Sequence, residues 1–310
     1  MDISIQPLQR TIEAPDGANL LDTLLAHQIR ISYSCMAGRC GTCRCQLDGQ
    51  TVLACQTTLT ENCTVDIPEI DEVVVHPARI LKTSVTAIDD LTHDIKRLRL
   101  KLSKPFAFSP GQYATLQFTP DHIRPYSMAV TQNPDEIEFH VRRVPDGRVT
   151  SYVASTLKVG DTVRVSGPLG TAYLRRKSTG PIVCIAGGTG LAPVLSILRG
   201  IAEADMANPV HVYVGVRSPA DVYGEPWLDA LRHALPNLTV HIVVATGDTG
   251  TRHRTGMVTQ AVDEDWHRMD DCTAYVAGAP AMVDAATALL QRKGLPSARI
   301  HADAFHISGT

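Results

Sequence analysis

The hydrophobic and polar positions divide the chain into three stretches with different periodicities. In the first, roughly residues 1–72, alternating apolar and polar residues predict strands over Ile3–Leu8 and Thr11–Ala14. A helix with Asp16 as its predicted N-cap follows, because leucines then recur at helical spacing. These leucines form one apolar face: Leu20, Leu21, Leu24 and Leu25. The first stretch therefore predicts a small domain of strands and one helix.

The second stretch, from about residue 79 to 174, is a succession of short alternating strands after a linker at residues 71–80. Pro, Gly and Asp turns separate the strands, and only residues 149–157 predict a good helix. Five strands cover residues 82–88, 96–102, 113–118, 136–144 and 162–167. Together with a short strand around Arg124, they predict an antiparallel six-stranded β-barrel.

The third stretch begins at Gly180, where continuous apolar strands alternate with helices. This alternation predicts a parallel sheet covered on both faces, which binds nucleotides at the carboxyl ends of its strands. We expect five strands, at residues 181–187, 210–216, 238–246, 273–278 and 299–305. The three predicted domains are residues 1–72, 73–178 and 179–310.

Length and composition are those of an ordinary globular protein of several domains. The chain has 310 residues, of which 44% are hydrophobic and 20% charged. Its net charge of −3 gives no reason to expect a nucleic acid as partner. No apolar run approaches the roughly 18 residues that span a bilayer, and residues 1–13 lack the apolar core of a secretory signal. We therefore expect a cytoplasmic protein that contacts no membrane.

Four of the eight cysteines are the strongest chemical signal in the chain. The first three have the spacing C-x4-C-x2-C, which is typical of a plant-type [2Fe–2S] cluster held by four thiolates. The candidate ligands are Cys35, Cys40, Cys43 and Cys55. Gly38 and Gly41 allow the loop to wrap so that backbone N–H groups point at the sulfurs. Such a cluster moves one electron at a time, and the cysteine usage favours a reducing compartment over a disulfide framework.

Two motifs in the predicted barrel are suited to a flavin. In the first, Arg124 supplies a cation for a pyrophosphate, Tyr126 a flat partner for an isoalloxazine, and Ser127 a donor near flavin N5. Pro125 lies within this motif. The second motif opens the predicted helix, where unpaired N–H groups suit the same pyrophosphate, and comprises Gly147, Arg148, Val149 and Thr150. The strand between them is expected to line the ring with His140, Val141 and Arg142.

Two glycine-containing turns at strand ends predict a dinucleotide site. The first follows an apolar strand and begins a helix, and it comprises Gly187, Gly188, Thr189 and Gly190. It differs from the G-x-G-x-x-G fingerprint, so an ordinary Rossmann dehydrogenase is not indicated. The second turn repeats this context on the fourth strand and comprises Gly278, Ala279 and Pro280. Arg217, at the end of its strand, can reach a ribose or a phosphate.

Taken together, these residues resemble the ferredoxin–NADP⁺ reductase superfamily. The order of cluster, flavin and nucleotide domains is similar to that of reductase components of bacterial aromatic-ring-hydroxylating dioxygenases, of the naphthalene-dioxygenase type. Similar segments span almost the whole chain: SYSCMAGRCGTCRCQ, SPGQYATLQF, RPYSMA, GGTGLAPVLSI and GAPAMV. The resemblance implies a β-grasp ferredoxin domain with one [2Fe–2S] cluster, a barrel that binds FAD, and a domain that binds NAD(P)H.

The resemblance also implies an activity and partners. A hydride from the nicotinamide reduces FAD, and single electrons pass through the cluster to a small ferredoxin that feeds a Rieske oxygenase. Phe305 matches the aromatic residue that shields the flavin in relatives. NADH is expected, with NADPH possible, because Asp248 opposes a 2′-phosphate whereas Arg252 and Arg254 favour one. We expect a monomer, with Ser127, Tyr126 and Phe305 next to the reacting atoms.

Two departures from the family and three alternatives stay open. Only eleven residues separate Cys43 from Cys55, fewer than in relatives, and Cys63 offers a longer spacing. Ala277 stands where many relatives have a cysteine. The alternatives are the reductase of a soluble multicomponent monooxygenase, a non-enzymatic iron–sulfur redox sensor, and a zinc site. Zinc is disfavoured because the sequence lacks a second C-x2-4-C pair.

Overall fold

The computed structural model describes residues 1–33, 35–38, 41–67, 76–130, 133–247, 249–250 and 252–306, which form two compact units. Unit 1 contains Met1–Ile80 with two short segments, Ala107–Ser109 and Ser166–Thr171, and unit 2 contains the other residues. Most of the predicted barrel and all described residues of the predicted nucleotide domain therefore lie in unit 2. The predicted boundary at residues 72 and 73 lies outside the described residues, and the one at 178 and 179 stays a prediction.

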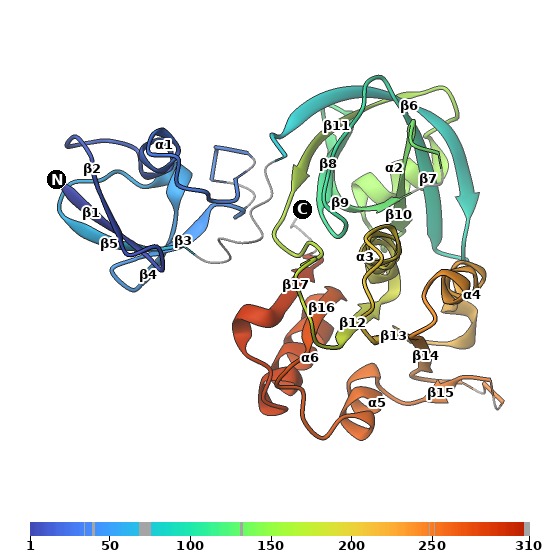
Figure 1. Ribbon diagram of the computed structural model, residues 1–310. Coiled ribbons are helices and arrows are strands. Elements are labelled where there is room, and N and C mark those ends of the chain that lie inside the picture. Colours follow the sequence, from blue (N-terminus) through green and yellow to red (C-terminus); the bar gives the residue numbers. More distant parts are fainter. Residues whose placement is uncertain are drawn as a thin grey trace. The chain divides into compact units, whose positions relative to one another are not determined.

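Unit 1 is a five-stranded mixed sheet packed on one helix (Figure 1). Its elements are β1 (Asp2–Gln6), β2 (Arg10–Glu13), α1 (Leu20–Ala26), β3 (Arg44–Leu47), β4 (Gln50–Leu53), the 3₁₀-helix η1 (Ala54–Gln56) and β5 (Cys63–Asp66). The strand order is β2–β1–β5–β3–β4, with β1 antiparallel to β2 and parallel to β5. The leucine face of α1 is buried in one core with Ile3 and Ile5 of β1, as its spacing predicts.

Helix α1 begins after Asn19, so the prediction of Asp16 as its N-cap is wrong. The Asn19 side chain accepts a hydrogen bond from the backbone N–H of Asp22 at 3.2 Å. Upstream, the backbone N–H of Gly17 donates to the carbonyl of Leu59 at 2.9 Å. Because Gly17 is paired with this distant segment, the helix begins only after Asn19. The local sequence pattern around Asp16 does not reveal this pairing.

The barrel of unit 2 closes with six strands, as predicted. Its elements are β6 (Arg79–Asp90), β7 (Ile95–Leu102), β8 (Tyr113–Thr119), β9 (His122–Val130), β10 (Glu136–Arg142), α2 (Arg148–Ser155) and β11 (Thr162–Leu169). The strands follow one another around the barrel in the order β10–β7–β6–β11–β8–β9, and β9 pairs with β10 to close it. The predicted helix is α2, and it packs against β9 and β10.

The second part of unit 2 is a parallel sheet in the order β15–β14–β13–β12–β16–β17. Its strands are β12 (Ile182–Gly187), β13 (Val210–Val216), β14 (Leu238–Val244), β15 (Arg254–Thr255), β16 (Thr273–Gly278) and β17 (Ile300–Ala304). Its helices are α3 (Leu191–Glu203), α4 (Glu225–Ala234), α5 (Val258–Asp265) and α6 (Pro280–Arg292), with short 3₁₀-helices η3 (Gly188–Gly190), η4 (Pro219–Asp221) and η5 (Ser297–Arg299). The five predicted strands are present. The sixth, β15, is too short to show a periodicity in the sequence.

Both faces of this sheet are buried, as the continuous apolar strands predict. Along β12, Ile182 and Cys184 pack with leucines of α3 and α4, whereas Val183 and Ile185 pack with residues of α5 and α6. Alternate residues of one strand therefore serve two cores. Among the described residues, no helix is long and apolar enough to cross a membrane.

The short segment between Cys43 and Cys55 is a tight hairpin of β3 and β4. Asp48 and Gly49 connect the strands with φ values of 47° and 79°, which are those of a type I′ turn. The Asp48 carboxylate accepts a hydrogen bond from the backbone N–H of Thr64 at 2.8 Å. The two cysteines thus lie at the open end of one hairpin, and the backbone N–H of Ala54 donates to the Cys43 carbonyl at 3.0 Å.

Replacing Gly49 with alanine should destabilise this hairpin by about 1 kcal/mol, because side chains other than glycine are strained at this φ. A Cβ there would meet nothing within 4 Å, so the cost is conformational. Loss of the visible absorbance of the iron–sulfur cluster in urea measures the effect. Gln50→Ala, at the neighbouring exposed position, is the control, and an equal shift in both variants would contradict the turn assignment.

Candidate cofactor and electron-transfer site

The described cysteines of the motif have the hydrogen-bond donors that a thiolate-bound cluster requires. The backbone N–H of Ala37 donates to Cys35 Sγ at 3.4 Å, and that of Cys55 donates to Cys43 Sγ at 3.5 Å. Cys43 and Cys55 are buried and Cys35 is half-buried. Cys40 lies outside the described residues. The surroundings fit a cluster, because N–H groups aimed at sulfur stabilise ligand thiolates.

Cys55 fits the fourth ligand position better than Cys63. Cys63 begins β5, where its neighbour Thr64 hydrogen-bonds Asp48 at the turn end of the hairpin, opposite to Cys43. Burial, with the charges of Asp48 and Glu61, raises the pKa of Cys63, which disfavours the thiolate that a metal needs. The fourth ligand therefore stays a proposal, with Cys55 supported by its hydrogen bond to Cys43.

The first flavin motif lies on β9 and contains an unsatisfied polar atom. The hydroxyl of Tyr126 is buried, and within the described part of the chain it has no hydrogen-bond partner. Burial raises the pKa of Tyr126, although nearby Arg124 opposes this effect, so the hydroxyl stays a neutral donor. Leaving such a group unpaired costs free energy, so its presence fits a bound molecule with a polar acceptor. An FAD bound in the barrel would supply such acceptors.

Asp303 is a site residue that the sequence analysis missed. The Ser127 hydroxyl donates to Asp303 Oδ2 at 2.8 Å, between positions 176 residues apart in the chain. Asp303 lies on β17, opposite Ala277 of β16 in the parallel pairing. Burial raises the pKa of the Asp303 carboxyl, and the hydrogen bond from Ser127 opposes this. The available signal was a carboxylate in the last predicted strand, which by itself does not reveal Ser127 as its partner.

Phe305 lies beside the second glycine turn. Its backbone N–H donates to the carbonyl of Gly278 at 2.8 Å, directly after β17. Ser127, Asp303 and Phe305 therefore belong to one region, where β9 of the barrel meets β17 of the parallel sheet. The arrangement supports the prediction that Phe305 covers the flavin, which stays a prediction.

The second flavin motif begins α2, as predicted. Gly147 is the N-cap, and a Cβ there would overlap the Thr150 hydroxyl, which donates to the Gly147 carbonyl at 3.2 Å. Val149 is buried and Arg148 is exposed. Val141 and Thr150 line one surface hollow together with both cations and carboxylates, and Lys96 there is paired with Asp90 at 2.6 Å. The structure thus brings the helix start and the intervening strand together, and the free N–H groups at the start of α2 are the part of this region that suits a pyrophosphate.

The side chains of His140 and Arg142 face the nucleotide half of unit 2 instead of an open ring site. His140 makes contacts of 3.0 Å with Glu138 and 3.1 Å with the Tyr223 hydroxyl, which also donates to the Gly188 carbonyl at 3.3 Å. Arg142 donates to Asp94 at 2.7 Å. Val141, between them on β10, lines the surface hollow described above, and the prediction that these three residues line a flavin stays a prediction.

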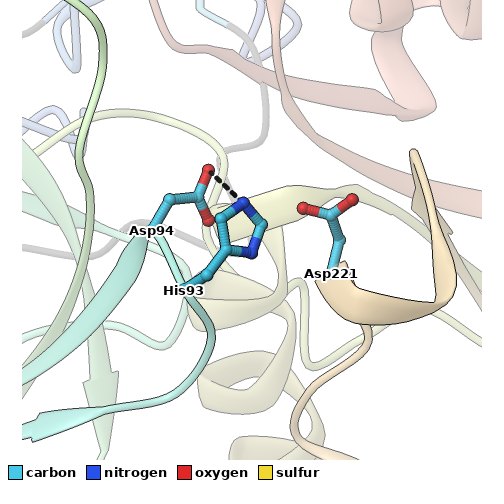
Figure 2. Close-up of side chains that lie close together, drawn as sticks. All are labelled: His93, Asp94 and Asp221. Carbon is cyan, nitrogen blue, oxygen red and sulfur yellow. Dashed lines mark ion pairs between the residues drawn. The ribbon is translucent and has the colours of Figure 1, made fainter.

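His93, Asp94 and Asp221 form a cluster with the composition of a metal site (Figure 2). Arg142, however, donates to Asp94 Oδ2 at 2.7 Å and to Asp221 Oδ1 at 3.4 Å. His93 Nε2 is 4.0 Å from Asp94 Oδ2, the pair joined by the dashed line. Because a guanidinium already compensates both carboxylates, the cluster is an ion-pair joint between the barrel and η4.

The two glycine turns meet at the carboxyl ends of the neighbouring strands β12 and β16. A Cβ at Gly190 would overlap the carbonyl of Ala277, and one at Gly278 would lie 3.0 Å from the carbonyl of Gly187. Ala279 caps α6 and Pro280 is its first residue, while Thr189 lies within η3. Arg217, directly after β13, is exposed. Both turns therefore serve one site, at the position where parallel sheets bind nucleotides.

The fold and these sites define a class of protein, a modular oxidoreductase with iron–sulfur, flavin and nicotinamide sites in one chain. Three family descriptions match in that order. The 2Fe-2S iron-sulfur cluster binding domain matches residues 3–62, the oxidoreductase FAD-binding domain residues 82–173, and the oxidoreductase NAD-binding domain residues 184–288. The chain thus has the domains for all three predicted cofactors.

Two curated relatives cover the whole chain and are covered completely by it. One is the ferredoxin–NAD(P)⁺ reductase component of naphthalene 1,2-dioxygenase/salicylate 5-hydroxylase systems from Ralstonia sp., with 54% identity. The other, the corresponding component of the naphthalene 1,2-dioxygenase system of Pseudomonas putida, has 50% identity. A crystal structure of an Amycolatopsis cytochrome P450 reductase has a TM-score of 0.76 and 30% identity, with 98% of each chain covered.

The chain belongs to the ferredoxin–NAD(P)⁺ reductase family. It is an oxidoreductase that transfers electrons, as the resemblance in the sequence implies. Both alignments extend over 327 positions, whereas this chain has 310 residues. The relatives therefore contain residues without a counterpart here.

Asp303→Asn should stabilise unit 2 at neutral pH. The pKa of the Asp303 carboxyl is higher in the folded than in the unfolded protein. Such a group makes the folded protein less stable as pH rises from the unfolded-state pKa to the folded-state pKa. The variant should therefore gain stability relative to the original protein as pH rises above the ordinary pKa of an aspartate, about 3.9, measured by urea unfolding followed by flavin fluorescence. Asp284→Asn, on the exposed side of α6, is the control. A gain that shrinks with rising pH would contradict the buried position of Asp303.

Proposed function

We propose that the protein takes electrons from NAD(P)H and delivers them to a small, Rieske-type ferredoxin of an aromatic-ring-hydroxylating dioxygenase. One observation carries the proposal: full-length identity of 54% and 50% to reductase components of naphthalene dioxygenase systems. A reductase of propane 2-monooxygenase from Mycolicibacterium smegmatis is 31% identical over 98% of the chain. A monooxygenase partner is therefore the second candidate.

The proposed cofactor sites follow from the residues described above. When bound, FAD accepts a hydride and releases its electrons singly, which the cluster and its one-electron partner require. The pyrophosphate is held by Arg124 and by the start of α2 at Gly147–Thr150. Tyr126 donates its unsatisfied hydroxyl to the cofactor. The two glycine turns receive the dinucleotide, with Arg217 at its phosphate or ribose.

Ser127 and Asp303 act together at the reacting end of the site. The Ser127 hydroxyl has one hydrogen, which here is donated to Asp303. When Asp303 is protonated, which burial favours, it can donate to Ser127, and the hydroxyl hydrogen of Ser127 is then available for flavin N5. Asp303 is thus a positioning residue for Ser127. Phe305 excludes water from the same face until the nicotinamide arrives.

The charge pattern favours NADH over NADPH. Arg252 donates to Glu225 at 3.0 Å, and Arg254 donates to both Glu264 and Asp265 at 2.7 and 2.6 Å. The two cations expected to attract a 2′-phosphate are therefore already paired, and Asp248 lies outside the described residues. Because the exposed Arg217 can reach a phosphate, we expect NADPH to be used as well, but as the weaker substrate. The ratio of kcat/KM for the two coenzymes measures this preference.

The setting of the proposed reaction is a monomer in the cytoplasm. The described cysteines of the chain are free thiols, which suits a reducing compartment. We propose no contact with membranes or nucleic acids. The redox-sensor alternative requires a barrel without flavin, and the zinc alternative requires a protein without the brown colour and absorbance of an iron–sulfur cluster.

Ser127→Ala should slow flavin reduction by NADH on the order of tenfold, the effect of one lost hydrogen bond of about 1.4 kcal/mol. Anaerobic stopped-flow absorbance of the holoprotein measures this step. Ser155→Ala is a matched control, because the Ser155 hydroxyl bonds only within or beside α2. If Ser127→Ala slowed cluster oxidation by the partner and left flavin reduction unchanged, the assigned role would be wrong.

The partner is tested by NADH-driven reduction of candidate acceptors. We expect the purified protein to reduce a Rieske ferredoxin of a ring-hydroxylating dioxygenase faster than it reduces the dioxygenase itself or the hydroxylase of a monooxygenase. Absorbance of the acceptor under anaerobic conditions follows the transfer. Faster reduction of a monooxygenase hydroxylase would select the second candidate. Protein that binds no flavin and no iron would contradict both.

A further inference from the structure

Gln56 directly follows Cys55 in η1, and its side chain turns back onto this cysteine. The amide nitrogen Nε2 lies 2.9 Å from the Cys55 carbonyl oxygen and 3.6 Å from Cys55 Sγ. A carbonyl oxygen only accepts hydrogen bonds, so the shorter contact establishes which end of the amide faces Cys55. The nitrogen carries two hydrogens and can donate to the oxygen and the sulfur together.

The cysteine loop holds this side chain in place. A Cβ at Gly38, between Cys35 and Cys43, would lie 2.9 Å from Gln56 Cγ and 3.1 Å from Cδ. Gly38, whose φ of 71° also favours glycine, therefore leaves the space that Gln56 fills. Although Gln56 is exposed, its amide is restrained on one side by the loop and on the other by Cys55.

The donor to Cys55 differs in kind from the donors to the other described cysteines. Cys35 and Cys43 receive backbone N–H groups, from Ala37 and Cys55, which no side-chain replacement removes. Within the described part of the chain, the recorded donor to Cys55 Sγ is the Gln56 side chain. The recorded hydrogen bond to the Cys55 sulfur thus depends on the identity of residue 56.

We infer that Gln56 raises the reduction potential of the [2Fe–2S] cluster through its hydrogen bond to the Cys55 sulfur. Hydrogen bonds to the sulfurs are among the determinants of cluster potential. An N–H group aimed at a ligand sulfur stabilises the form with more negative charge, which is the reduced form. Gln56 thereby favours electron flow from the flavin to the cluster. The inference rests on the proposed assignment of Cys55 as the fourth ligand.

The test is the midpoint potential of the cluster in the holoprotein, from an anaerobic redox titration followed by electron paramagnetic resonance. In Gln56→Leu, the equilibrium constant for reducing the cluster with a dye of known potential should fall about tenfold, or 59 mV for a one-electron couple. Gln56→Glu should lower it further, because a carboxylate cannot donate and adds a negative charge. The flavin potential, measured in the same samples, should stay constant.

Gln46→Leu is the matched control. Gln46 is also an exposed glutamine of unit 1, but its side chain donates to the Thr51 hydroxyl at 3.2 Å. Its replacement should leave the cluster potential unchanged. An unchanged potential in Gln56→Leu would overturn the inference. If Gln56→Leu lost its cluster, the test would use Gln56→Glu instead. A cluster potential in Gln56→Glu equal to that of the original protein would then overturn the inference.

Failure of the ligand assignment has a different signature. If Cys55 is a ligand, Cys55→Ser should alter the visible spectrum and the paramagnetic signal of the cluster, because an oxygen replaces a sulfur. An unchanged spectrum in Cys55→Ser, combined with an altered one in Cys63→Ser, would show that Cys63 is the ligand. That result would remove the basis of the inference while leaving the electron-transfer function intact.

Discussion

The close backbone contact at the carboxyl end of β16 is the constraint on which the site of unit 2 depends. The Ala277 carbonyl leaves no room for a side chain at Gly190, and the Gly278 carbonyl accepts the N–H of Phe305. Pairing of β17 at this point places Asp303 opposite Ala277, from where it receives the hydrogen bond of Ser127. Both glycine turns, the aromatic residue and the barrel strand are thus positioned by one short stretch of main chain.

A second connection joins the barrel to the glycine turns through alternate side chains of β10. His140 contacts the Tyr223 hydroxyl, which donates to the Gly188 carbonyl, while Arg142 bridges Asp94 and Asp221. These side chains are the ones that sequence reasoning assigned to the flavin. A strand presents two faces, and the structure uses one for the contact between the two halves of the unit. The chemistry of a residue and its place in a strand therefore do not by themselves show which protein side chains it contacts.

In unit 1, the short segment between Cys43 and Cys55 still brings these two candidate cluster ligands close together. A two-residue turn at Asp48 and Gly49 brings Cys43 and Cys55 to one end of a hairpin, where the N–H of Cys55 meets the Cys43 sulfur. Because the hairpin is compact, Gln56 emerges against the cysteine loop, and a side-chain amide becomes part of the surroundings of a ligand sulfur.

The sequence by itself determined the order of the domains, the thiolate spacing, the β-rich middle and the glycine turns at strand ends. These properties depend on residues within one element or one loop, so periodicity and spacing report them directly. Only the tertiary structure decided that Asn19 caps α1, that Arg142 holds two carboxylates, and that Asp303 receives Ser127. The contacts of Arg142 and Ser127 join distant positions, and the start of α1 at Asn19 depends on the pairing of Gly17 with the distant Leu59. A one-dimensional pattern contains no information on such a pairing, because its free energy arises only when both segments are packed.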